Sequence, residues 1–290
     1  MSTTINSELE IDKRLLKAFS VESLKAVFNL TESKERQAGL LNIISRSYTT
    51  DDLYSIVFEH FSLLKQYVYL YEFKGALDDE WLDKHPSFIS KQKISNSHSI
   101  FNLLIPVTYE GYNKTQRDVQ EFNFLVPVQI HKKKNILSIH INLLERDIAT
   151  ITSDTILSPR RDINDEKILA SITPYANPTH LYKYDLNKGI KKLWHENEIE
   201  AMKVKFKKAK STSQEVMDES DFGIKKEMPK EYAELIKTPI RQTTFRLLEK
   251  ENLVNFFVVD PTTGIFNFSV YPPYLNGIND LIDLVVKNNN

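Results

Sequence analysis

The sequence predicts an α+β protein, with a small N-terminal helical bundle followed by a mainly antiparallel β-sheet body with flanking helices. Apolar residues recur every three or four positions up to about residue 65, and they alternate with period two in several later segments. The chain has 290 residues, of which 41% are hydrophobic and 27% charged, so it can bury a substantial core. We place a helical module at 1–66 and a strand-rich α+β body at 67–290.

Four short helices are expected between residues 8 and 65. Ser20 is typical of an N-cap for the second helix, and Thr49 or Thr50 opens the fourth. Asp51 and Asp52 follow in the first turn of that fourth helix, where the helix dipole favours negative charge. A compact set of short helices of this kind is typical of a docking or dimerisation module. Its apolar stripes comprise Leu15, Leu16 and Phe19, then Leu24, Val27, Phe28 and Leu30, then Leu40, Leu41, Ile43 and Ile44, and finally Leu53, Ile56, Val57, Phe61 and Leu64.

The first part of the body reads as strands. Runs rich in β-branched and aromatic residues predict strands at 67–73, 100–109, 121–130 and 135–144. The tetrapeptide His131-Lys132-Lys133-Lys134 separates the last two runs and predicts a basic hairpin tip. Pro106 and Pro127 lie inside two of the runs, which favours edge positions or bulges because proline cannot donate to the ladder.

The second part of the body mixes helices and strands. We expect a connector at 150–178, a helix at 186–198, a strand at 199–207 and a polar loop or lid at 211–230. A short helix at 230–237 and strands at 243–248, 254–259 and 265–271 follow. The turn Asp260-Pro261-Thr262-Thr263-Gly264 between the last two strands is a hairpin signal. A helix at 274–287 completes the chain.

Several chemistries are excluded by composition and spacing. The absence of cysteine removes disulfides, thiolate catalysis and cysteine-ligated metals. The seven glycines are never closer than 13 positions, so the glycine-rich phosphate loops and the nucleophile elbow are missing. The seven histidines show no local metal-ligand spacing. We therefore expect no cofactor and no catalytic residues.

Charge and hydropathy bear on location and partners. The N-terminus is polar without a signal-peptide run, and no stretch is apolar enough for a membrane helix, so an intracellular protein (cytoplasmic, nuclear or nucleoid) without a membrane partner is expected. The formal net charge is −1, so any nucleic-acid site has to be a local patch.

One lysine-rich segment fits such a patch. Between Lys183 and Lys210 there are nine lysines against four acids. In the segment 202–207, Met202, Val204 and Phe206 alternate with three lysines, so a strand would bury the first set and expose the second. Lysines two residues apart on a strand are roughly 6.6 Å apart, close to the phosphate spacing of a nucleic-acid strand. The candidate phosphate contacts are Lys203, Lys205, Lys207, Lys208 and Lys210, joined if the fold permits by Lys188, Lys191, Lys192, Lys132, Lys133, Lys134, Arg160 and Arg161.

Two other interpretations of these residues stay open. The lysines also suit a solvated sheet face, or an edge strand protected against aggregation. The acids Glu215, Asp218, Glu219 and Asp221 can either screen the patch or fold over it as a gate. A metal-dependent nuclease would need carboxylates at strand ends, for which Glu121, Glu145, Asp147 and the triplet Asp165-Glu166-Lys167 are the candidates.

The order of elements resembles, distantly, that of the centromere protein N family of kinetochore DNA-binding adaptors. The resemblance lies in an N-terminal helical segment containing 21–28 (Val-Glu-Ser-Leu-Lys-Ala-Val-Phe), a strand-rich body, and a lysine-rich helix-to-strand segment at 185–207. In that family the helical domain and the adjoining body form a basic groove on nucleosomal DNA, which implies a non-catalytic nucleic-acid adaptor. The N-terminal module of this chain is about neutral where that of the family is basic.

Three functions therefore follow from the sequence. The leading hypothesis is a non-catalytic nucleic-acid-binding protein or adaptor that uses the lysine-rich strand face. The alternative is an interaction subunit of a multi-protein assembly, such as a prokaryotic defence complex, docking a protein partner through the helical module. The third is a metal-dependent nuclease.

Overall fold

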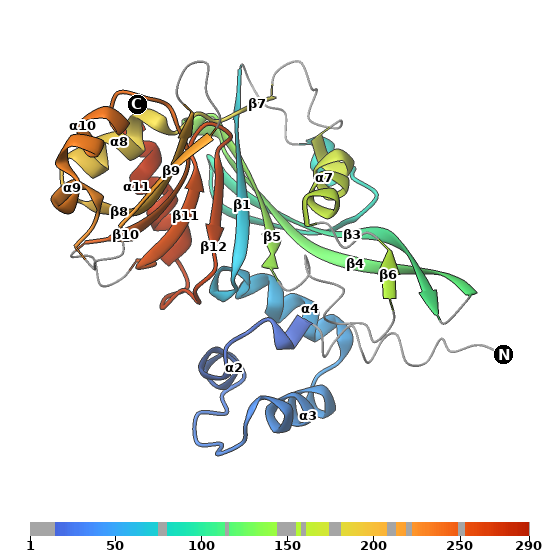
Figure 1. The fold of residues 1–290 in the computed structure, drawn as a ribbon. Helices are drawn as coiled ribbons and strands as arrows, with labels where there is room; N and C mark the ends of the chain where they lie inside the picture. The colour runs from blue at the N-terminus through green and yellow to red at the C-terminus, as the bar shows by residue number, and fades with distance from the viewer. Residues whose placement is uncertain are drawn as a thin grey trace.

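A computed structural model describes residues 15–74, 80–113, 116–143, 155–157, 161–173, 181–207, 213–218, 222–248 and 253–289. Within these residues the fold is α+β, with a large antiparallel sheet and helices on both of its faces (Figure 1). No helix in the described ranges is both long and apolar enough to span a bilayer.

The N-terminal helices begin at the predicted caps. Ser20 Oγ accepts a hydrogen bond of 3.0 Å from the Ser23 amide, and Thr49 forms a reciprocal capping box with Asp52. The helical elements are α2 (Val21–Val27), α3 (Gln37–Ser47), α4 (Thr50–Glu59) and the 3₁₀ helix η1 (Phe61–Leu63). Their hydrophobic cluster extends into the sheet at Leu104 and Leu125. The domain boundary expected after residue 66 stays a prediction.

The described strands form one twelve-stranded sheet, and all their pairings are antiparallel. The order is β2-β3-β4-β5-β1-β12-β11-β10-β8-β9, with β6 beside β3 and β7 beside β1. The long β3–β4 hairpin extends away from the rest of the molecule (Figure 1). The strands are β1 (Gln66–Phe73), β2 (Phe88–Ser95), β3 (His98–Asn113), β4 (Gln116–His131), β5 (Ile136–Asn142), β6 (Thr155–Leu157), β7 (Leu181–Lys183), β8 (Ile199–Lys207), β9 (Ser213–Met217), β10 (Ile240–Leu247), β11 (Phe256–Asp260) and β12 (Ile265–Phe268).

Helices cover opposite faces of the two halves of the sheet, and β1 contributes to both cores. On one face, α8 and α11 bury Val68 and Leu70 together with the inner residues of β8, β10, β11 and β12. On the other face, α7 and α5 cover β3, β4 and β5, with Tyr69 and Tyr71 of β1 beneath them. The remaining elements are α5 (Glu80–Asp83), η2 (Lys132–Lys134), α7 (Arg161–Ile172), α8 (Asn187–His195), α9 (Ile224–Glu227), α10 (Pro229–Leu235) and α11 (Gly277–Asn289).

A buried polar belt lies between the N-terminal helices and α11. The Gln66 amide nitrogen donates to the carbonyls of Phe61 and Leu64, which turns its Oε1 toward His140 Nδ1 at 2.7 Å. His140 Nδ1 must therefore carry the proton, and Ser138 Oγ donates to the other ring nitrogen at 3.0 Å. Burial lowers the pKa of His140 to about 3, so its ring is neutral near neutral pH and each polar group of the belt has a specific partner.

Several sequence predictions are corrected. The expected connector at 150–178 contains β6 and α7, and the expected lid at 211–230 contains β9 and α9. Both segments are polar and their apolar runs are short, so their periodicity carried no clear signal. The strands β2 and β7 were not predicted either, because β2 is largely exposed and β7 has three residues.

The two prolines occupy locally unpaired edges of inner strands. Pro106 pairs with Asn123 of β4, but it lies between the stretches of β3 that pair with β2 and with β6. Pro127 pairs with Asn102, and the β4–β5 ladder begins one residue later, at Val128. At each proline, no described ladder uses the N–H group that proline lacks. This agrees with the predicted edge positions.

Candidate nucleic-acid interface

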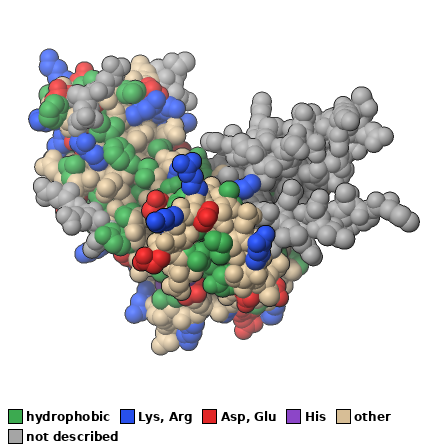
Figure 2. Space-filling view, turned by 90° about the horizontal axis from the view of Figure 1, so that it is seen from below, with side chains coloured by type: hydrophobic (Ala, Val, Ile, Leu, Met, Phe, Trp, Pro, Cys, Tyr) green, Lys and Arg blue, Asp and Glu red, His purple; other side chains and the backbone are tan. Residues whose placement is uncertain are grey.

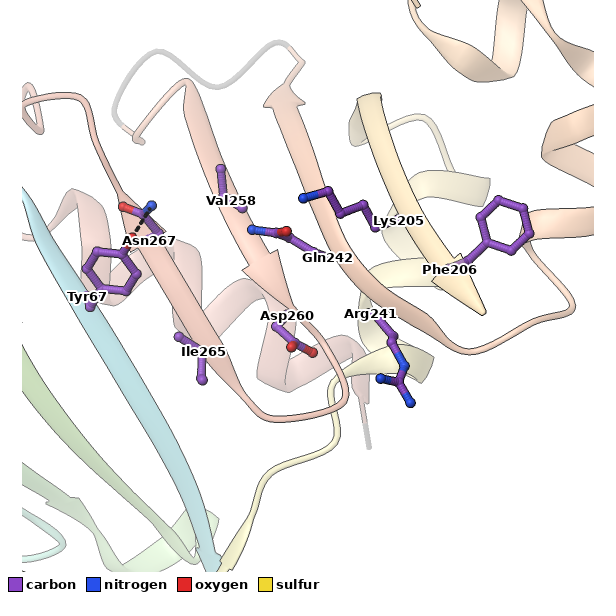
Figure 3. A pocket seen from close by; sticks show the side chains of 9 residues that line it. All are labelled: Tyr67, Lys205, Phe206, Arg241, Gln242, Val258, Asp260, Ile265 and Asn267. Atoms are coloured by element: carbon purple, nitrogen blue, oxygen red, sulfur yellow. Dashed lines mark hydrogen bonds between the residues drawn. The ribbon is translucent and has the colours of Figure 1, made fainter. Parts of the chain in front are cut away.

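In the described part of the chain, no helix covers one face of the C-terminal half of the sheet, and we call this the open face. The helices α8 and α11 cover the inner face of this half, whereas α7 and α5 cover only the N-terminal half of the other face. On this open face lies a cavity of about 340 Å³, lined by side chains from β1, β8, β10, β11 and β12 (Figure 3). The lining residues are Tyr67, Lys205, Phe206, Arg241, Gln242, Val258, Asp260, Ile265 and Asn267.

Strand register aligns the side chains of this face in two rows. One row runs from Lys203 through Thr244 and Val258 to Asn267 and Tyr67, each paired with the next. The Asn267 amide donates to the Tyr67 hydroxyl at 2.8 Å, which closes the row on the β1 side.

The second row carries the charged groups of the cavity. In this row Lys205 pairs with Glu215 on one side and with Gln242 on the other. Further along the row, Asp260 pairs with Ile265. Val258 and Ile265 form an apolar floor between the polar groups (Figure 3).

A β-bulge adds one more cation to this rim. The β8–β10 register shifts between Ile240 and Gln242, so Arg241 is the extra residue. Ile240 is buried, whereas both Arg241 and Gln242 are exposed. Bulges commonly redirect a side chain in this way, and here the bulge brings a guanidinium to the end of the cavity (Figure 3).

Lys203 and Lys205 lie on the open face, and both contact an acid. Glu215 Oε1 lies 2.7 Å from Lys203 Nζ, and Oε2 lies 3.8 Å from Lys205 Nζ. The hydrogen bond from Lys203 is the main reason that the pKa of Glu215 is lowered. Of the two roles considered for the acids after the lysine strand, the structure places Glu215 in the screening one.

The predicted alternation of the lysine strand is only partly correct. Val204 and Phe206 are buried, but Met202 is only half-buried and Ala201 is buried instead. A second register shift, between Thr244 and Phe245, places Met202 at a bulge. The strand is also not an edge, because β9 pairs along its outer side, so protection of an exposed edge does not explain its lysines.

The fold places the other predicted phosphate contacts away from the open face. Lys188, Lys191 and Lys192 belong to α8, which packs on the opposite face from Lys203 and Lys205. Burial lowers the pKa of Lys191, against the opposing effect of Asp185.

The lysines of the β4–β5 turn are also distant from this face. Lys132, Lys133 and Lys134 form η2, and four strands separate β5 from β8 in the sheet order. At about 4.8 Å per strand spacing that is on the order of 24 Å. Lys134 is held by Asp283 of α11, with 2.6 Å between Nζ and Oδ1.

Some candidates lie where side chains or whole residues are not described. Lys207 ends β8 and Arg161 begins α7, and only their backbone is described. Lys208, Lys210 and Arg160 lie outside the described residues, as do Glu145 and Asp147 of the nuclease hypothesis. The triplet at 165–167 lies on α7, not at a strand end. In the part of the chain that is described, no three histidine or acidic side chains gather as a metal site would require.

Comparison with known proteins does not assign the chain to a family. No protein-family model matches the chain, and a search of curated proteins finds no match either. The geometry of the open face is therefore the evidence that bears on function.

Proposed function

We propose that this chain is a non-catalytic binding protein that holds nucleic acid on the open sheet face, with phosphates at Lys203 and Lys205. The observation that carries the proposal is that Lys203 and Lys205 lie on the open face, where Lys205 lines a cavity whose end carries Arg241. These three cations on one face give the phosphates of a strand several donors.

The combination of cations and apolar side chains on the open face favours binding of single-stranded nucleic acid over a duplex. Proteins that bind unpaired nucleic acid combine cations that follow the backbone with an apolar or aromatic surface for the bases. Here Val258 and Ile265 supply such a surface between the polar groups, and Phe256 of β11 is 39% exposed.

The charge on this face is modest. Glu215 and Asp260 offset part of the charge of Lys203, Lys205 and Arg241. We therefore expect moderate affinity that decreases steeply with salt, because phosphate contacts release counterions.

The test is fluorescence anisotropy with labelled single-stranded DNA, duplex DNA and RNA, at low and near-physiological salt, first in EDTA and then with Mg²⁺. We expect salt-sensitive binding in EDTA, lost in the double variant Lys203→Glu, Lys205→Glu. The matched control is Lys188→Glu with Lys192→Glu, which makes the same charge change on the helix-covered face. The control should bind as the unmodified chain does.

Each other outcome is informative. Equal loss in both double variants would indicate a general charge effect and refute the assignment to this face. No binding to any of the three probes would refute the proposal. A signal that decays with time only in Mg²⁺ would favour the nuclease instead.

A second candidate function is protein interaction through the N-terminal helical module. On the side of the molecule that carries these helices, hydrophobic side chains lie at the surface among charged ones (Figure 2). Ile43 of α3 is 38% exposed, and a cavity of about 270 Å³ lies where α4 and η1 meet the sheet and the start of α11. Ile94 and Leu275 line this cavity and are 55% and 40% exposed. This candidate predicts a dimer, measurable by light scattering after size-exclusion chromatography, that Ile43→Asp dissociates. A monomer in both cases would contradict it.

A further inference from the structure

The cavity on the open face contains opposite charges close together. Lys205 and Arg241 bring positive charge, whereas Asp260 brings a carboxylate two strands from β8. A site for phosphate alone would not include a carboxylate, because the two anions repel each other. The combination suits a ligand that carries an anion at one end and N–H donors at the other.

The geometry of Asp260 leaves one of its oxygens for a ligand. Oδ1 accepts from the Thr262 amide at 3.1 Å and from the Thr262 hydroxyl at 2.6 Å, which fixes the side chain in the β11–β12 turn. Those two bonds orient the carboxylate, so Oδ2 has a set direction at the end of the cavity. Figure 3 shows the carboxylate beside Gln242 and Ile265, on the same side of the sheet as Lys205.

The strands that carry the opposite charges are not adjacent. β8 and β11 are separated by β10, so the backbones that carry Lys205 and Asp260 are about 10 Å apart. The intervening residue is Gln242, whose amide both donates and accepts. Val258 of β11 and Ile265 of β12 also line the cavity and offer a flat base an apolar surface.

We propose that this cavity holds one unpaired base bearing an exocyclic amino group, which donates to Asp260 while the adjoining phosphate contacts Lys205. This inference rests on the proposed binding of nucleic acid and adds the class of base. A carboxylate accepts from the amino groups of cytosine, adenine or guanine. In thymine and uracil the only N–H lies between two carbonyl oxygens, which a carboxylate repels.

The experiment compares four labelled twelve-nucleotide strands by anisotropy at one salt concentration: oligo-dC, oligo-dA, oligo-dT and an abasic strand with the same phosphates. We expect oligo-dC and oligo-dA to bind at least about fivefold tighter than oligo-dT and the abasic strand, the low end of what one specific base contact contributes. The variant Asp260→Asn keeps an oxygen for the two Thr262 bonds and should lose this preference while still binding oligo-dT.

The outcomes separate the two proposals. Equal binding of all four strands would overturn the base site and leave the phosphate-binding function standing. Binding of none would refute the function and, with it, the base site. If Asp260→Asn kept the full preference for oligo-dC and oligo-dA, the base site would also be overturned, because Asp260 would then not be the group that recognises the base.

Discussion

The Glu215 carboxylate and the Lys203 ammonium form an ion pair of 2.7 Å between β9 and β8, and Lys205 lies 3.8 Å from the second carboxylate oxygen. Both side chains of the closer pair are more than one-third exposed. The Lys203 hydrogen bond is the main cause that lowers the pKa of Glu215, and the carboxylate is ionised near neutral pH as glutamate ordinarily is. A phosphate that binds these lysines therefore competes with Glu215 for them.

The first prediction concerns that competition. Glu215→Gln should increase nucleic-acid affinity by roughly two- to fivefold, since an exposed ion pair contributes little free energy. Anisotropy titrations at low salt measure the change. Glu231→Gln on α10 removes the same charge from the helix-covered face and should leave affinity unchanged. Equal gains in both variants would show that only net charge matters.

The second prediction concerns the buried histidines. Burial is the main cause that lowers the pKa of His140 to about 3 and that of His131 to about 4. His98 stacks on His131 with ring centroids 3.8 Å apart, and Lys134 adds positive charge near both, while Asp283 opposes it. The unfolded chain takes up protons near pH 6.5 and the folded chain does not, so stability should decrease as the pH falls from about 7 to 5.

Urea unfolding of His140→Gln measures how much this one histidine contributes to the decrease in stability between pH 7 and pH 5. Glutamine keeps a hydrogen-bonding group but does not titrate, so the loss of stability between pH 7 and 5 should become smaller. His195→Gln, at an exposed position, is the control and should keep the slope of the unmodified chain. An identical slope in all three proteins would contradict the assignment to His140.

The third prediction concerns Asp165 on α7, which is 2% exposed. Burial raises its pKa to about 8, so the folded chain keeps a proton that the unfolded chain loses above about pH 4. This group therefore lowers stability as the pH rises from 4 to 8, opposite in sign to the histidines.

Asp165→Asn should then raise the free energy of unfolding at pH 8, on the order of 1–4 kcal/mol at about 1.4 kcal/mol per pKa unit, with little change at pH 4. Chemical denaturation at both pH values measures it. Glu166→Gln, an exposed neighbour on the same helix, should change little at either pH. Destabilisation by Asp165→Asn at pH 8 would show that the native state needs the carboxylate. The histidine slopes are best measured in the Asp165→Asn background, where this opposing titration is absent.

The fourth prediction concerns Gly264 in the β11–β12 turn. Its φ is +66°, and an added Cβ would lie 2.7 Å from the Tyr184 carbonyl oxygen and 2.8 Å from that of Leu70. Gly264→Ala should therefore destabilise the fold by at least about 1–2 kcal/mol. In Gly39→Ala, within α3, the nearest obstacle is the flexible Glu35 side chain, so that variant should be neutral or gain up to about 1 kcal/mol. Thermal unfolding compares the two, and equal stability would contradict the turn argument.

Local signals in the sequence predicted much of the secondary structure. Ser20 and Thr49 mark helix starts because their side chains cap free amides. The segment 199–207 was predicted as a strand with the same bounds that β8 has. Such features depend on neighbours within a few residues, and single-sequence patterns record those neighbours.

The local patterns failed where a segment was short or where strand pairing changed the register. The strand β9 has five residues and no clear alternation, so it was read as part of a lid. The bulges at Met202 and Arg241 reverse which side chains are buried, and both arise from the pairing of β8 with β10. A bulge depends on the partner strand, which lies more than thirty positions away along the chain.

By itself the sequence determined the class of fold, the helix caps, the lysine-rich strand and the lack of familiar catalytic loops, because these follow from periodicity and side-chain chemistry. Only the tertiary structure decided which cations share a face. It placed Lys203 and Lys205 on the face that also carries Arg241 and Asp260, and it placed the lysines of α8 on the opposite side of the sheet. The reason is that the order of strands in a sheet and the face on which a helix packs depend on contacts between distant segments, which no local pattern encodes.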